Sequence, residues 1–107
     1  MASLPRDPMP GRVLRLARHM MGMSQRGFAA RVKMKTKTLG KVEAGSRPAH
    51  GFVLESAAHA AGLPPQALVI LADVARGQVT LSPEQRAWLA ERMLDAVLRG
   101  LKDGAAL

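Results

Sequence analysis

The stretch KMKTKTLGKVEAG, residues 33–45, combines two patterns that predict different structures. Residues 33–38 alternate lysine with methionine or threonine, and strict alternation is typical of a strand. The stretch then ends in Glu43-Ala44-Gly45, and a glycine after the last turn is a common way for a short helix to close. The sequence on either side decides between the two structures.

Helical patterns occupy the chain on both sides of this stretch. Residues 12–21 carry apolar side chains at helical spacing and end at Gly22, and Ser24 can cap a second helix. Further along, apolar spacing predicts one helix at about 52–61 and another from 63 to 77, opened by two prolines. These segments make the surroundings of the quoted stretch helical.

A last helix is predicted from the capping box SPEQ, residues 82–85, to about residue 101. No segment other than residues 33–38 alternates like a strand, so we predict an all-α chain of about six helices. A lone strand among helices would have no partner for its backbone hydrogen bonds. We therefore interpret residues 33–35 as a tight turn into a helix over residues 36–44, whose lysines are exposed.

Positive charge is concentrated in one half of the chain. The whole sequence has 16 basic and 8 acidic residues, a formal net charge of +8. Residues 1–50 hold eleven basic and two acidic residues, whereas residues 51–107 hold five basic and six acidic residues. The two halves therefore carry +9 and −1, which indicates one face built to bind a polyanion.

Composition argues against several other classes of protein. Without cysteine there is no disulfide or thiolate metal site, and the three histidines lack ligand spacing, so we expect no metal and no cofactor. No apolar run approaches the roughly 18 residues of a membrane span, and residues 1–12 lack a signal-peptide core, so we expect a cytoplasmic protein. Paired carboxylates and a phosphate-cradling glycine loop are missing, so we expect no catalytic residues and no enzyme.

From residue 13 to residue 68 the chain resembles the five-helix DNA-binding domain of Cro/XRE-type, lambda-repressor-like helix-turn-helix regulators. The resemblance is carried in order by MSQRGFAARV (23–32), TKTLGKVEAGSRPA (36–49) and LESAAHAAGLPPQAL (54–68). It implies a recognition helix at residues 36–44 that enters the major groove of duplex DNA. We expect a flexible arm at 1–10, the DNA-binding domain at 11–77 and a C-terminal helix at 78–107.

The resemblance also implies roles for individual residues. Gln25 matches the residue that clasps a phosphate and braces the recognition helix. Arg18 and Glu43 fall where the family often has a buried ion pair, and Glu43 is the only acid between residues 8 and 54. An unpaired carboxylate there would repel phosphate. The implied DNA-contacting residues are Gln25, Arg26, Lys35, Thr36, Lys37, Thr38, Lys41, Ser46 and Arg47.

Three positions depart from the family's pattern. Lys33 stands where the family usually has glycine, so the turn must hold a less relaxed backbone. Lys35 stands at the cap of the recognition helix, where its side chain cannot accept from the exposed N–H groups. Gly40 lies inside that helix and costs about 1 kcal/mol relative to alanine.

The last helix has a broad apolar stripe with two interpretations. It either folds back onto the five-helix core or pairs with a second copy. The residues predicted to form a dimer are Trp88, Met93, Leu94, Val97, Leu98 and Leu101.

Two functions fit these features. The first is a homodimeric transcriptional regulator, a repressor of a small operon that can include its own gene, bound to a pseudo-palindromic operator at the nucleoid. The second is the antitoxin of a toxin–antitoxin pair, which binds its operator and a partner toxin.

Overall fold

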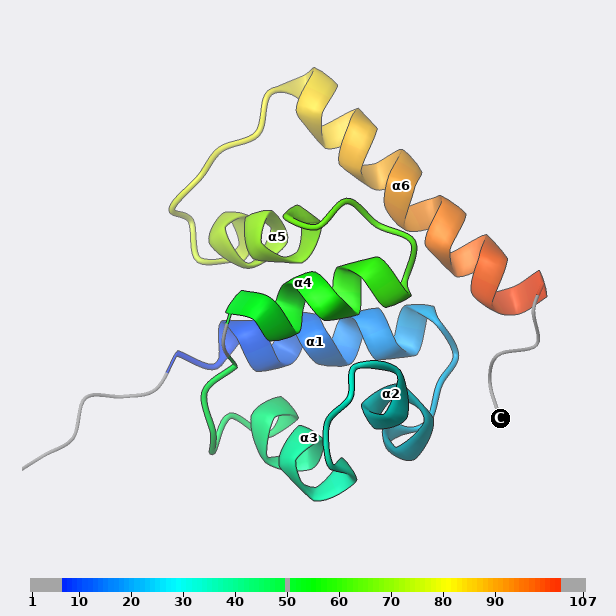
Figure 1. The fold of residues 1–107 in the computed structure, drawn as a ribbon. Coiled ribbons are helices and arrows are strands. Elements are labelled where there is room, and N and C mark those ends of the chain that lie inside the picture. The colour runs from blue at the N-terminus through cyan, green and yellow to red at the C-terminus, as the bar shows by residue number, and fades with distance from the viewer. Residues whose placement is uncertain (1–6, 50, 103–107) are drawn as a thin grey trace, which may run out of the picture.

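A computed structural model describes residues 7–49 and 51–102 of the 107-residue chain. Within these residues no strand is present, which confirms the predicted all-α fold with a C-terminal helix (Figure 1). The helices are α1 (Met9–Met20), α2 (Gln25–Arg31), α3 (Thr36–Glu43), α4 (Gly51–Ala60), α5 (Ala67–Ala75) and α6 (Pro83–Lys102).

The helices are arranged around α1. Figure 1 shows α1 and α4 side by side across the middle, with α2 and α3 below them and α5 above. Leu14 of α1, Phe28 of α2, Leu39 of α3 and Leu68 of α5 are the largest fully buried side chains. Helices as short as α2 and α3 are unstable in isolation. Burial in this common core therefore holds them in place.

The stretch at residues 33–45 is helical from Thr36 to Glu43, one residue short of the predicted 36–44. The chain turns at residues 32–35, and Leu39 N–H then donates to the Lys35 carbonyl (2.9 Å), which begins the α3 ladder. Gly45, with φ 83°, follows the end of α3 in the left-handed conformation that favours glycine.

Two predicted boundaries are wrong, and prolines explain both. α1 begins at Met9, so the expected arm at 1–10 overlaps the helix; proline fits a first turn because its missing N–H has no partner there. The rest of that arm, residues 1–6, lies outside the described residues. α5 begins only at Ala67. Pro64 precedes Pro65 and is therefore disfavoured in the α conformation, and residues 65 and 66 form a turn in which Ala67 N–H donates to the Pro64 carbonyl (3.0 Å).

α6 packs against the core along one of its faces. Its first turn has the predicted capping box: Ser82 N–H donates to Gln85 Oε1 (2.9 Å), and Gln85 N–H donates to Ser82 Oγ (3.1 Å). Leu89 and Ala96 are buried. Figure 1 shows the helix running diagonally past α5 and α4 toward the end of α1. The fold-back interpretation is therefore correct for this face.

None of the helices in the described part of the chain combines the length and apolarity that a membrane span requires.

Candidate nucleic-acid interface

The turn between α2 and α3 sets the direction in which α3 is presented. Met34 N–H donates to the Ala29 carbonyl (2.8 Å), and Lys33 N–H donates to the Ala30 carbonyl (3.3 Å). Lys33 has φ 57° and is the only residue other than glycine with a positive φ in residues 7–49 and 51–102. A left-handed backbone costs a residue that has a Cβ roughly 1–2 kcal/mol. The strain expected at Lys33 is therefore present.

The two helices of this unit begin differently. Ser24 caps α2 as predicted, its Oγ accepting a hydrogen bond from Gly27 N–H (3.1 Å). Lys35 stands at the N-cap of α3 and makes no side-chain cap hydrogen bond. The first-turn N–H groups of α3 are thus left without a side-chain acceptor, and such groups are donors to anions such as phosphate.

Arg18 and Glu43 form a bidentate ion pair between α1 and α3. Arg18 Nε lies 2.9 Å from Glu43 Oε2, and Arg18 Nη2 donates to Oε1 at 3.0 Å. Their side chains are 11% and 4% exposed, respectively. Arg18 Nη1 also donates to the Met23 carbonyl (3.1 Å), at the entrance to α2. One guanidinium therefore connects three helices and neutralises the carboxylate of Glu43.

Gln25 is held by the same carboxylate. Its Nε2 donates to Glu43 Oε1 (3.2 Å), which links the start of α2 to the end of α3. A Cβ added to Gly40 would lie 3.8 Å from Gln25 Oε1, so this amide rests against the middle of α3. Gln25 therefore braces α3, and its contact with phosphate stays a prediction.

α3 exposes one side and buries the other. Thr36, Lys37 and Lys41 are exposed, and Thr38 is half-buried. The opposite side, which includes Leu39, packs against α1 and α2. The outward residues are thus available to a large ligand while the inward ones fix the helix.

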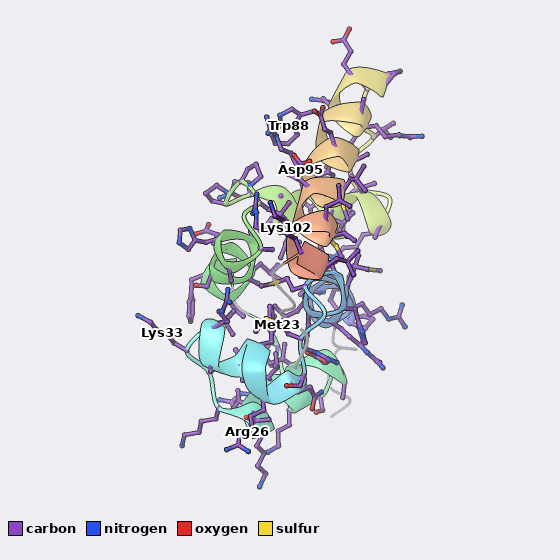
Figure 2. All side chains as sticks on the ribbon, turned by 90° about the vertical axis from the view of Figure 1, so that its right-hand side faces the viewer. Met23, Arg26, Lys33, Trp88, Asp95 and Lys102 are labelled. Carbon is purple, nitrogen blue, oxygen red and sulfur yellow. The ribbon has the colours of Figure 1, made fainter. Side chains whose placement is uncertain are left out.

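The other predicted DNA-contacting residues flank α3. Arg26 on α2 is exposed and lies at the tip of the molecule in Figure 2. Lys35 precedes α3, and Ser46 and Arg47 follow it, all exposed. The Ser46 hydroxyl donates to the Lys41 carbonyl (3.2 Å), so it also helps to close α3.

This end of the molecule is strongly positive. Residues 23–49 contain seven lysines or arginines and a single acid, Glu43, which Arg18 pairs. A surface with this charge attracts a polyanion over several ångströms of solvent.

The residues predicted to form a dimer do not share one surface. Met93 packs partly buried against the core, and Val97 is also half-buried. Trp88 projects from α6 near the end of the molecule opposite Arg26 (Figure 2), with the Arg92 guanidinium 5.7 Å from its ring centre. The exposed aliphatic members are Leu94, Leu98 and Leu101.

Two features that the sequence did not reveal position the site. A Cβ added to Gly11 would lie 2.1 Å from the Val42 carbonyl oxygen, so α1 and α3 touch there through their backbones. No local signal distinguishes this glycine from one in an exposed turn. The second feature is an ion pair between Asp7 and Arg76, residues too far apart in sequence to be paired by inspection.

Asp7 ties the start of α1 to the end of α5. Its carboxylate accepts from Met9 N–H (3.0 Å) and from Arg76, which also pairs with Asp73 (2.7 Å). The Met9 hydrogen bond, reinforced by Arg76, lowers the pKa of Asp7 below its ordinary value. The carboxylate therefore stays charged and holds this end of α1 at neutral pH.

The comparison with known families agrees with this geometry. The sequence matches the family model described as a helix-turn-helix domain over residues 11–69. That span runs from the first turn of α1 into α5 and contains α2, the turn and α3, but not α6. No curated protein and no solved structure matches the chain.

Proposed function

The chain belongs to the helix-turn-helix domain family, and from that premise we propose that it is a sequence-specific transcriptional regulator of the Cro/XRE type that binds duplex DNA. The proposed activity is binding without catalysis. The observation that carries it is the exposed, cationic side of α3 on an end of the molecule whose one acid is neutralised from within.

In the proposed complex, α3 lies in the major groove. An α-helix with its side chains is roughly 10–12 Å in diameter, which matches the width of that groove, about 12 Å. Lys37 and Lys41 reach base edges, where lysine pairs with the O6 and N7 of guanine, and Thr36 accompanies them. Gln25 and Arg26 contact phosphates and set the register of the helix.

We further propose that the protein acts as a homodimer that represses a small operon, which can include its own gene. One helix of this length reads only a few base pairs. Two copies related by a two-fold axis read a pseudo-palindrome with half-sites about 34 Å apart, one turn of DNA. Occupation of such an operator by a dimer blocks transcription of the adjoining gene and keeps the protein at the nucleoid.

The second candidate function is that of an antitoxin. The exposed leucines of α6 favour it, because an uncovered apolar stripe outside the matched domain can bind a partner toxin. Purification from a host that expresses the neighbouring genes distinguishes the candidates. A stoichiometric small protein bound to the chain supports the antitoxin, and its absence supports the stand-alone regulator.

Selection of bound sites from random duplex DNA tests the principal proposal. We expect enrichment of a pseudo-palindrome whose half-sites are separated by about 10 base pairs. The matched control is the variant carrying Lys37→Ala and Lys41→Ala, which should enrich no consensus while retaining its fold. Failure of the unmodified protein to enrich any sequence at low salt would refute the proposed function.

A further inference from the structure

α6 carries an apolar stripe that its own chain leaves uncovered. Leu94, Leu98 and Leu101 are 56%, 53% and 75% exposed. Their spacing, i, i+4 and i+7, places them in one row along the helix. This row is rotated away from Leu89 and Ala96, the residues through which α6 contacts the core. The three leucines therefore form a ridge, which we call the α6 ridge.

A groove lies directly beside this ridge. It is a hollow of about 430 Å³ where the C-terminal half of α1 approaches the C-terminal half of α6. The two helices come close because of Gly100, where an added Cβ would lie 3.1 Å from the Met20 carbonyl oxygen. Leu101 belongs to both the ridge and the groove. The residues that line the groove include Leu16, His19 and Met20 of α1 and Val97, Gly100 and Leu101 of α6.

Opposite charges border this surface. On the α1 side, Arg12 and Arg15 are exposed, and neither is in an ion pair within the described residues. On the far side of the ridge, Glu91 is exposed, also without an ion pair in that part of the chain. The surface thus runs from cation to groove to ridge to carboxylate.

We propose that a second copy of this chain docks on this surface, each α6 ridge inserting into the α1–α6 groove of the other copy. A two-fold interface uses the same patch twice, so the patch must complement itself. Here one patch supplies a ridge and a groove side by side, and cations on one border with a carboxylate on the other. A two-fold axis that lies between the ridge and the groove, parallel to both, sets each ridge opposite the partner's groove and each Glu91 border opposite the partner's Arg15 border.

This inference rests on the proposed function, because it describes the interface of the proposed homodimer. The two copies meet through a surface shared by α1 and α6, and not through the expected contact between the two α6 helices alone. Met93 and Trp88 are not needed for it, since Met93 packs inward and Trp88 lies with Arg92. Figure 2 shows α6 apart from the end of the molecule marked by Arg26, so docking along α6 leaves α3 exposed. A different protein bound here would need only one of the two charged borders, whereas a second copy of this chain uses both.

A charge exchange between copies tests the proposal without DNA. Glu91→Arg places like charges together twice in the dimer, and Arg15→Glu does the same. We expect each variant alone to dimerise at least about 100-fold more weakly than the unmodified chain. Mixing the two variants restores both attractive pairs in a heterodimer, and its affinity should return to within roughly threefold of the original. Sedimentation equilibrium measures the dimerisation constants of the unmodified chain, of each variant and of the mixture.

Two further variants show whether the effect belongs to this interface. Glu55→Arg makes the same charge change on α4, at an exposed residue that belongs neither to the ridge nor to the groove, and should leave dimerisation unchanged. Leu98→Arg should give a folded monomer, judged by circular dichroism. A dimer that survives Leu98→Arg, or a mixture that fails to re-form the dimer, would overturn the proposal.

The outcome is separable from that of the proposed function. If the unmodified chain is a monomer in solution and still binds the selected DNA, the second copy is not the occupant of this surface and the regulator proposal stands. If it is a dimer through this surface and binds no duplex, the proposed function fails and the interface stands.

Discussion

The carboxylate of Glu43 has a structural role at an end of the molecule where residues 23–49 contain no other acid. It receives hydrogen bonds from Arg18 and Gln25, at 2.9–3.2 Å, and is nearly inaccessible to solvent. Because burial removes both partners from water, neither can be lost without leaving the other uncompensated. Glu43 could be recognised as a structural residue from the sequence because it is the only acid between residues 8 and 54.

Glu43→Gln should destabilise the fold by about 3–5 kcal/mol, since the guanidinium of Arg18 is left buried without its counter-charge. Urea denaturation followed by circular dichroism measures the change. The control is Glu55→Gln, an identical chemical change at an exposed residue without an ion pair in the described chain, whose hydrogen bond from Gln66 a glutamine oxygen can also accept; it should stay within about 0.5 kcal/mol. Equal stability of the two variants would contradict the structural role of the pair.

Two glycines within helices give opposite expectations. At Gly11, a Cβ would meet the Val42 carbonyl oxygen at 2.1 Å, and backbone cannot move aside as a side chain can. Gly11→Ala should therefore cost about 1–3 kcal/mol by forcing α1 from α3. At Gly40 the nearest atom is 3.8 Å away, an ordinary contact. Gly40→Ala should gain about 1 kcal/mol from helix propensity.

Paired denaturation curves of these two variants provide the measurement, each serving as the control of the other. A loss of stability in Gly40→Ala would mean that the close contact with Gln25 is less tolerant than its distance indicates.

On α3, we expect Lys37 and Lys41 to contribute more to the preference for one DNA sequence than to the affinity for DNA in general. Lys37→Ala or Lys41→Ala should weaken the selected site by about 1–3 kcal/mol more than random duplex, because a lysine at a guanine edge discriminates between bases. Arg26→Ala, on α2, should weaken both DNAs alike if it contacts phosphate. Fluorescence anisotropy at fixed salt measures each constant. If the two lysine variants lost equal affinity for both DNAs, Lys37 and Lys41 would contact the DNA phosphates and not the bases.

The helices could be predicted from the sequence because the signals that define them are local. Helical spacing, the caps at Ser24 and at residues 82–85, and the glycine after α3 all act within a few residues. The starts of α1 and α5 were misplaced because proline permits a first turn in one case and delays it in the other. The resemblance implied the Arg18–Glu43 pair by position, whereas no local pattern indicated that Gly11 or Gly100 lets two helices touch.

For the molecule as a whole, the concentration of positive charge in residues 1–50 determines how DNA binding should depend on salt. Binding of the positive end to DNA must release counterions, and contact with about five phosphates gives a slope of log K against log salt of roughly −4 to −5. Titrations at several potassium chloride concentrations measure the slope. Arg26→Ala should make it less steep by about one if that residue touches phosphate. A slope near zero would mean that the excess charge of residues 1–50 is not used on DNA.

The two sides of α3 can change independently of each other. The buried residues of α3 hold the helix against the core; they are Leu39, Val42 and Glu43. Thr36, Lys37 and Lys41 reach only outward. If α3 binds DNA as proposed, substitutions confined to these three outer residues change the bases that are recognised and leave the buried side, and with it the fold, intact. The same separation makes the chain a scaffold for engineering. A library that varies only residues 36, 37 and 41 should yield variants with new DNA-sequence preferences at little cost in stability.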